Sequence, residues 1–361
     1  MISEKILNKI NNKKPKYYNP CSIPLTTRIL SKRNFSIYTS LLSLDGGTAI
    51  PNVVIRKDGS IHSNVSYSRK LSSFSIFQTL GIVRSIQNFE NFLKGIDYIK
   101  EKLNKDEEVM LAVSCFYLPY SKDFMNMDYF KEYEKFGIHY ISVTDINESS
   151  IRVYDTTPKI EDRWIKLEDF ERAWEGDGAF KFLKDMKNVL ILNPYSYYEI
   201  EILQNKVDIL EFSLLVLKKN IENLVVGKKI TENEEEFYFG ELANIMLIDL
   251  SRNALLENNW SKISQISLSL NESKFSRFFL RDYLSDISLM LPELDIFRVE
   301  IESCIKNFER LTNRLNIEIN KKSYDIKKIK ILEKKIEKYF KQELSLYLKM
   351  DTYLEKMLGV K

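Results

Sequence analysis

GIHYISVTDINESSIRVYDTTP, residues 137–158, has the pattern of a β-hairpin that carries a histidine near one end and an aspartate near the other. Two runs rich in β-branched residues flank a polar turn around Asn147, as in two antiparallel strands. A loop centred on Asn147 predicts that His139 lies directly opposite Asp155, where the two side chains can touch. The register decides this contact, because a shift by one residue would pair His139 with Thr156. A carboxylate here would fix the tautomer and orientation of the imidazole, as a general base requires.

Strand and helix signals alternate irregularly over the first two hundred residues. EEVMLAVSCFYLPYS (107–121) and NVLILNP (188–194) are typical of further strands, whereas FENFLKGIDYIKEKL (89–103) and KLEDFERAW (166–174) have apolar residues at helical spacing. This mixture predicts an α+β fold.

The strand signals disappear after about Tyr198, and the remaining chain has apolar residues at helical spacing. A chain of 361 residues is long enough for two domains. We therefore expect a first domain over residues 1–195 that contains the hairpin and an all-helical domain over residues 196–361. The apolar faces of the helical domain would pack on the first domain or on a second copy of the chain, which would give a homodimer.

Charge and composition exclude several classes of protein. Basic and acidic residues number 54 and 51, which is too balanced for a protein that mainly binds nucleic acid. No apolar run is long enough to span a membrane, and the N-terminus lacks the pattern of a signal peptide, so we expect a cytoplasmic protein without a membrane partner. The sequence contains no HExxH motif for zinc and no GxSxG motif for a catalytic serine, and we expect no metal site.

The three cysteines lie far apart in the sequence, at positions 21, 115 and 304, so they indicate neither a zinc knuckle nor a disulfide framework. Cys21, in YYNPCSIPLTTRIL (17–30), directly precedes a segment that is predicted to be helical. The positive end of a helix dipole, and an imidazolium nearby, would favour its thiolate. A single cysteine is more often a small buried side chain, and we interpret Cys115 and Cys304 in this way, with His62 as a surface residue.

The segments SCFYLPYS, HYISVTDINESSIRVYDTT and IKLEDFERAW, in this order, resemble the papain-fold acyltransferases of the butirosin-pathway type, which are related to bacteriocin-leader cysteine peptidases. The resemblance covers roughly residues 15–180 and implies a papain-like cysteine-protease fold. Matched by position, it implies that Cys21 is the nucleophile, His139 the base and Asp155 the acid that orients it. The early cysteine, later histidine and following acidic residue have the order found in papain-like enzymes.

The activity implied by this resemblance is acyl transfer in specialised-metabolite biosynthesis, including that of nonribosomal peptides. An acyl or peptidyl carrier protein would present the acyl group as a thioester on its phosphopantetheine arm, with no other cofactor. The acyl group would pass through an acyl-cysteine to an amine, to form an amide. This chain is similar in size, composition and layout to the amide synthetases of the closthioamide pathway, which acylate a diamine.

One departure from the papain pattern concerns the oxyanion. Papain-like peptidases carry a glutamine shortly before the cysteine, whereas the position six residues upstream of Cys21 is Pro15. The Cys21 N–H and a second donor would replace the glutamine, with candidates Asn19, Tyr17 and Tyr18. Two alternatives stay open: a cysteine peptidase or hydrolase with the same three residues, and a catalytically inactive scaffold of the same fold.

Overall fold

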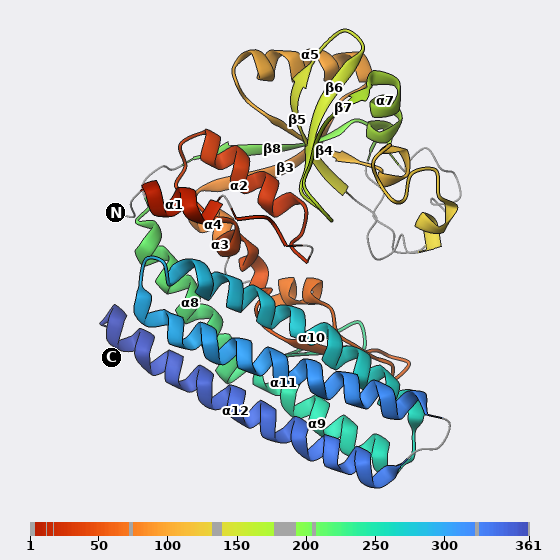
Figure 1. Ribbon diagram of the computed structural model, residues 1–361, viewed down its shortest axis with the longest axis vertical. Coiled ribbons are helices and arrows are strands. Elements are labelled where there is room, and N and C mark those ends of the chain that lie inside the picture. The colour runs from red at the N-terminus through yellow and green to blue at the C-terminus, as the bar shows by residue number, and fades with distance from the viewer. Residues whose placement is uncertain are drawn as a thin grey trace. The chain divides into compact units, whose positions relative to one another are not determined.

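The computed structural model describes residues 4–11, 13–16, 18–71, 75–131, 139–176, 193–203, 207–321 and 325–359 (Figure 1). The fold is α+β, as predicted, and every strand pairing in the described residues is antiparallel. The chain divides into two compact units, both built from separate stretches of sequence. We call them the sheet unit (Leu7–Leu42 and Leu80–Lys206) and the bundle unit (Met1–Ile6, Ser43–Thr79 and Val207–Lys361).

The sheet unit contains a six-stranded sheet in the order β3-β8-β4-β5-β6-β7 (Figure 1). Its strands are β3 (Ile82–Asn88), β4 (Val109–Val113), β5 (His139–Ile146), β6 (Ser150–Asp155), β7 (Glu161–Lys166) and β8 (Ser196–Ile202). The short helices of this unit are α5 (Phe92–Asn104), α7 (Leu167–Glu175), η3 (Cys115–Tyr117) and η4 (Met127–Lys131), together with α2 (Ser22–Lys32). Helices α1 (Glu4–Asn11) and α3 (Thr39–Ser43) span points where the chain passes between the two units.

Helices α5 and α7 bury one face of this sheet. Alternate residues of the strands, such as Leu111, Ile141 and Val153, form one apolar core with Ile99 of α5 and Trp174 of α7. Because successive side chains of a strand point to opposite faces, the residues between them face the other side.

Helix α2 lies against that other side of the sheet. Its Arg28 forms an ion pair with Glu108, and the guanidinium lies 4.2 Å from the centre of the Tyr154 ring. Glu108 also accepts a hydrogen bond from Ser142, which is opposite Tyr154 in the β5–β6 ladder. These contacts fix the helix that follows Cys21 to the strands that carry the histidine and aspartate.

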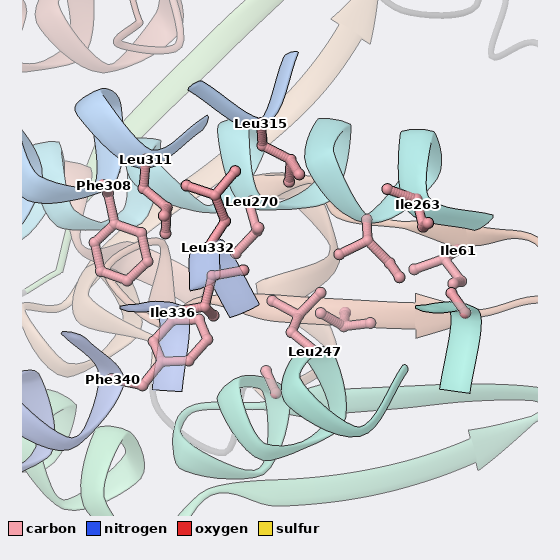
Figure 2. Close-up of a cluster of buried hydrophobic side chains, with 14 of the residues drawn as sticks. Ile61, Leu247, Ile263, Leu270, Phe308, Leu311, Leu315, Leu332, Ile336 and Phe340 are labelled. Atoms are coloured by element: carbon pink, nitrogen blue, oxygen red, sulfur yellow. The ribbon is translucent and has the colours of Figure 1, made fainter. Parts of the chain in front are cut away.

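The bundle unit combines a four-stranded sheet, in the order β2-β1-β10-β9, with long helices that run alongside one another (Figure 1). The strands are β1 (Asn52–Ile55), β2 (Ile61–His62), β9 (Lys228–Glu232) and β10 (Glu235–Phe239). The helices are α4 (Ile76–Thr79), α8 (Ile209–Val226), α9 (Glu241–Leu256), α10 (Trp260–Ile287), α11 (Asp295–Asn320) and α12 (Ile326–Leu358), with short turns η1 (Asp45–Gly47), η2 (Val65–Leu71) and η7 (Pro292–Leu294). Figure 2 shows their shared core, in which Ile61 of β2 and Leu247 of α9 meet side chains of α10, α11 and α12.

The part of the chain after residue 195 is not all-helical, in contrast to the prediction. Strand β8 joins the six-stranded sheet, and β9 and β10 form a hairpin between α8 and α9 in the range that was predicted to be helical. Asn233 and Glu234 both have positive φ angles, 51° and 64°, which is the geometry of a two-residue hairpin turn. Strands β9 (KKITE) and β10 (EEFYF) were missed because neither shows the alternation of apolar and polar positions that indicates a strand.

The two units also differ from the predicted ranges, 1–195 and 196–361, because residues 43–79 contribute β1 and β2 to the sheet that β10 and β9 complete. The strand predicted over 188–194 lies mostly outside the described residues.

Candidate active site

His139 and Asp155 form a hydrogen-bonded pair at one end of the β5–β6 hairpin, as predicted. His139 is the first residue of β5 and Asp155 is the last residue of β6. The His139 Nε2–H donates to Asp155 Oδ2 at 2.7 Å.

The predicted register of this hairpin is wrong by two residues. Ser142 is opposite Tyr154, so continuing the ladder would place Thr157 opposite His139, with Asp155 as a diagonal neighbour. The register also shifts by one residue nearer the turn, at a bulge between Val143 and Asp145. The contact survives because a shift by an even number of residues keeps His139 and Asp155 on the same face, and diagonal neighbours are within reach of a long side chain.

Three donors satisfy the Asp155 carboxylate, which is 1% exposed. Besides His139, the Tyr120 hydroxyl donates to Oδ2 at 3.1 Å, and the Thr157 backbone N–H donates to Oδ1 at 3.1 Å. A buried carboxylate needs such partners, because its loss of hydration is otherwise costly. The side chain is therefore held in one orientation against the imidazole.

The His139 imidazole is held in a defined orientation. Its Nε2 is engaged by Asp155, so Nδ1 is the ring nitrogen that remains to exchange a proton with another group. Burial lowers the pKa of His139, but the charges and hydrogen bonds of Cys115 and Asp155 outweigh burial and raise the pKa well above the usual 6.5. The ring therefore holds its second proton more readily than a free imidazole does.

Cys115 lies at this imidazole, although the apolar residues around it in the sequence predicted a core position. Strand β4 ends at Val113, which is opposite His139, and Cys115 follows two residues later in the turn η3. The thiol is half-buried at the margin of the sheet-unit core and contributes a hydrogen bond that raises the pKa of His139. The apolar run MLAVSCFYL concealed the end of the strand and therefore this position.

Cys21 directly precedes α2, as predicted, with Pro24 inside the first turn of the helix. Cys21 is half-buried. The Thr156 hydroxyl donates to the Cys21 carbonyl oxygen at 3.4 Å, which places the beginning of α2 beside the residue that follows Asp155. A direct contact between the Cys21 sulfur and His139 stays a prediction.

The oxyanion candidates are close to Cys21 in sequence. Tyr18 and Asn19 are half-buried in the segment before α2, where the Asn19 N–H donates to the Lys16 carbonyl oxygen at 2.9 Å. Tyr17 lies outside the described residues. Their role as donors to an oxyanion stays a prediction.

The remaining histidine and cysteine belong to the bundle unit. His62 is half-buried in β2, with Nε2 3.0 Å from the Ser60 hydroxyl, and burial lowers its pKa. Burial also raises the pKa of the Cys304 thiol in α11 to about 12, so this thiol is protonated at neutral pH. Neither residue has the environment of a reactive group.

Sequence reasoning missed two residues of the candidate site, Cys115 and Tyr120. Both belong to SCFYLPYS, where the chain turns repeatedly: the Leu118 N–H donates to the Cys115 carbonyl oxygen and the Ser121 N–H to that of Leu118. Proline at 119 was a signal for the end of the strand. It did not indicate which side chains the turns would bring to His139.

Comparison with protein-family models gives no match, and none of the curated protein sequences matches this chain. Over the described ranges, no helix combines the length and apolar character needed to cross a membrane. Within the same ranges, no group of three or more His, Cys, Asp and Glu side chains could hold a metal ion.

Proposed function

We propose that this protein is a thiol-dependent acyltransferase of papain-like fold that forms an amide from a carrier-protein thioester and an amine. The observation that carries the proposal is the buried His139–Asp155 pair, 2.7 Å apart, with the Cys115 thiol at the imidazole and the Cys21 carbonyl oxygen hydrogen-bonded to Thr156, the residue after Asp155. The resemblance of residues 15–180 to acyltransferases of the butirosin-pathway type supports the choice of acyl donor and acceptor. It also supports Cys21 as the nucleophile.

The reaction would proceed in two acyl transfers. The Cys21 thiolate attacks the thioester carbonyl carbon, and the carbon–sulfur bond to the phosphopantetheine arm breaks as that sulfur takes a proton from the His139 imidazolium. The acceptor amine then attacks the acyl-cysteine, His139 takes the proton that the amine loses, and the amide leaves as the Cys21 thiolate is restored. Asp155 stabilises the imidazolium and keeps Nε2 occupied, so that Nδ1 handles the proton.

Mass spectrometry of the intact protein tests this proposal. After incubation with an acylated carrier protein and no amine, we expect a covalent acyl adduct on the wild-type chain that Cys21→Ala abolishes. Cys304→Ala is the matched control and should retain the adduct, since burial raises the pKa of the Cys304 thiol and keeps it protonated at neutral pH. Cys115→Ala should also form the adduct, because we assign Cys115 to the surroundings of His139 and not to the nucleophile.

The outcomes separate the alternatives. An adduct that persists in Cys21→Ala and maps to Cys115 would move the nucleophile to the second thiol. Release of free acid in place of amide, when candidate amines are supplied, would favour the peptidase or hydrolase. The absence of any adduct on the wild-type chain would contradict acyl transfer and favour an inactive scaffold.

A further inference from the structure

From the hydrogen bonds around Asp155 we infer that Tyr120 is a positioning residue, which holds Asp155 Oδ2 against His139 and shares the charge of that oxygen. The same oxygen accepts from the His139 Nε2–H at 2.7 Å and from the Tyr120 hydroxyl at 3.1 Å. Tyr120 therefore competes with the imidazole for one acceptor atom. It acts on the reaction through Asp155 and His139.

The fold holds Tyr120 in place from two sides. The turns of residues 114–121 anchor its backbone, beginning with the Ser114 N–H that donates to the Ala173 carbonyl oxygen of α7. The Arg163 guanidinium of β7 lies 5.2 Å from the centre of the Tyr120 ring. Strand β7 and helix α7 thus help to determine where the hydroxyl points.

The Tyr120 hydroxyl is a permanent donor. Burial, together with the negative charge of Asp155, raises the pKa of Tyr120, so the phenol keeps its proton at neutral pH. A donor on Oδ2 withdraws part of the negative charge that the imidazolium sees. The groups that face His139 and Tyr120 from the neighbouring elements are Cys115, Asp155 and Arg163. The Tyr120 hydroxyl is itself easy to remove, because replacing tyrosine by phenylalanine deletes one oxygen atom and keeps the ring.

Removal of the Tyr120 hydroxyl should raise the pKa of His139. Without the Tyr120 hydroxyl, Oδ2 directs more of its charge to His139, so the imidazolium is stabilised and the pKa of His139 rises. The imidazolium is then a weaker acid toward the leaving thiol. Under the proposed function, on which this part of the inference rests, the turnover rate should fall while substrate binding is unchanged.

The experiment compares the full-length wild-type chain with Tyr120→Phe, and with Tyr98→Phe as the matched control. Tyr98 is a half-buried tyrosine of the same unit that packs on the sheet-unit core. NMR titration of the histidine ring protons should show a higher pKa for His139 in Tyr120→Phe only. Acyl transfer from a carrier thioester should show kcat about tenfold lower with KM unchanged, and the alkaline limb of its pH profile should move upward.

A second replacement guards against a variant that fails to fold. Site-specific 3-fluorotyrosine at position 120 keeps the ring and makes the hydroxyl a stronger donor, so the pKa of His139 should fall. The inference is overturned if the His139 titration is the same in wild type, Tyr120→Phe and the fluorinated protein, or if it moves in the opposite direction. Since the titration needs no turnover, failure of acyl transfer in every protein would contradict the proposed function alone.

Discussion

The buried carboxylate of Asp155 keeps its charge because hydrogen-bond donors, His139 among them, replace the water that it loses. Asp155 receives one backbone and two side-chain donors, and the charges and hydrogen bonds of Cys115 and Asp155 together outweigh what the imidazole loses by leaving water. The raised pKa of His139 means that this pair stabilises the fold below the unfolded value of 6.5, and that the contribution is lost as pH rises through the higher folded value.

The two histidines of the chain make this protonation measurable. NMR titration should show one imidazole, His139, with a pKa well above 6.5, and another, His62, with a pKa below it because of burial. His62→Gln should remove the low signal and so assign both. Asp155→Asn should lower the pKa of His139 and reduce acyl transfer by at least about a hundredfold. A His139 that titrates at or below 6.5 in the wild type would contradict the described pair.

At this scale the sequence allowed one half of the candidate site to be predicted. His139 and Asp155 could be paired because they lie on the same face for every even register of the hairpin. Cys115 and Tyr120 could not, because their places depend on where β4 ends and on the turns that follow, and these are set by contacts such as Ser114 with Ala173 of α7.

Among the elements, α2 depends on a buried cluster around Glu108, whose side chain is 2% exposed. Burial would raise the pKa of Glu108, but hydrogen bonds from Arg28 and Lys32 and their charges outweigh it, and the pKa is lowered from 4.5. Arg28 binds both carboxylate oxygens, and Ser142 of β5 donates to one of them. The cluster therefore links α2, and Cys21 just before it, to β4 and β5.

Glu108→Gln should weaken that link. We expect a loss of about 2 kcal/mol in the free energy of unfolding at neutral pH, since Arg28 and Lys32 lose a charged acceptor. Because the pKa of Glu108 is lowered, its stabilising effect is present above 4.5 and is lost as pH falls through the folded value, so the two proteins should converge in acid. Urea unfolding at several pH values measures both effects.

The matched control for this variant is Glu101→Gln, which removes a pair with Lys105 on the exposed side of α5. An exposed pair of this kind contributes little to the free energy of unfolding, because water and salt screen its charges. Equal losses in the two variants, or a difference that does not shrink at low pH, would contradict the role assigned to Glu108.

The helix α2 and the β5–β6 hairpin were predictable as elements because their patterns are local, whereas β9 and β10 were not. In β10 the consecutive residues Phe237, Tyr238 and Phe239 are all buried, but charged residues surround them in the sequence. Although β9 and β10 are joined by a two-residue turn, neither strand alternates apolar and polar residues, and the other partner of β10, β1, is far away in the chain.

In the molecule as a whole, sequence order and compact units do not coincide, and this explains why a single domain boundary could not be predicted. The chain passes from one unit to the other four times, after residues 6, 42, 79 and 206. Strand β3 pairs with β8, so the sheet unit needs residues on both sides of the predicted boundary at 195. Strand β1 likewise needs β10.

Cutting the chain at the predicted boundary should therefore destroy both units. A fragment of residues 1–195 lacks β8, which leaves β3 without its partner, and lacks β10, which leaves Val53 of β1 without its core. Exposed strand edges and apolar side chains of this kind lead to aggregation or partial unfolding. We expect no cooperative thermal transition by circular dichroism, whereas the full-length chain should show one.

A spliced chain that joins Leu42 to Leu80 by a Gly/Ser linker and ends at Lys206 retains every strand of the sheet unit, and it should melt cooperatively. If the 1–195 fragment melts cooperatively and the spliced chain does not, sequence order decides the folding units and the division described above is wrong.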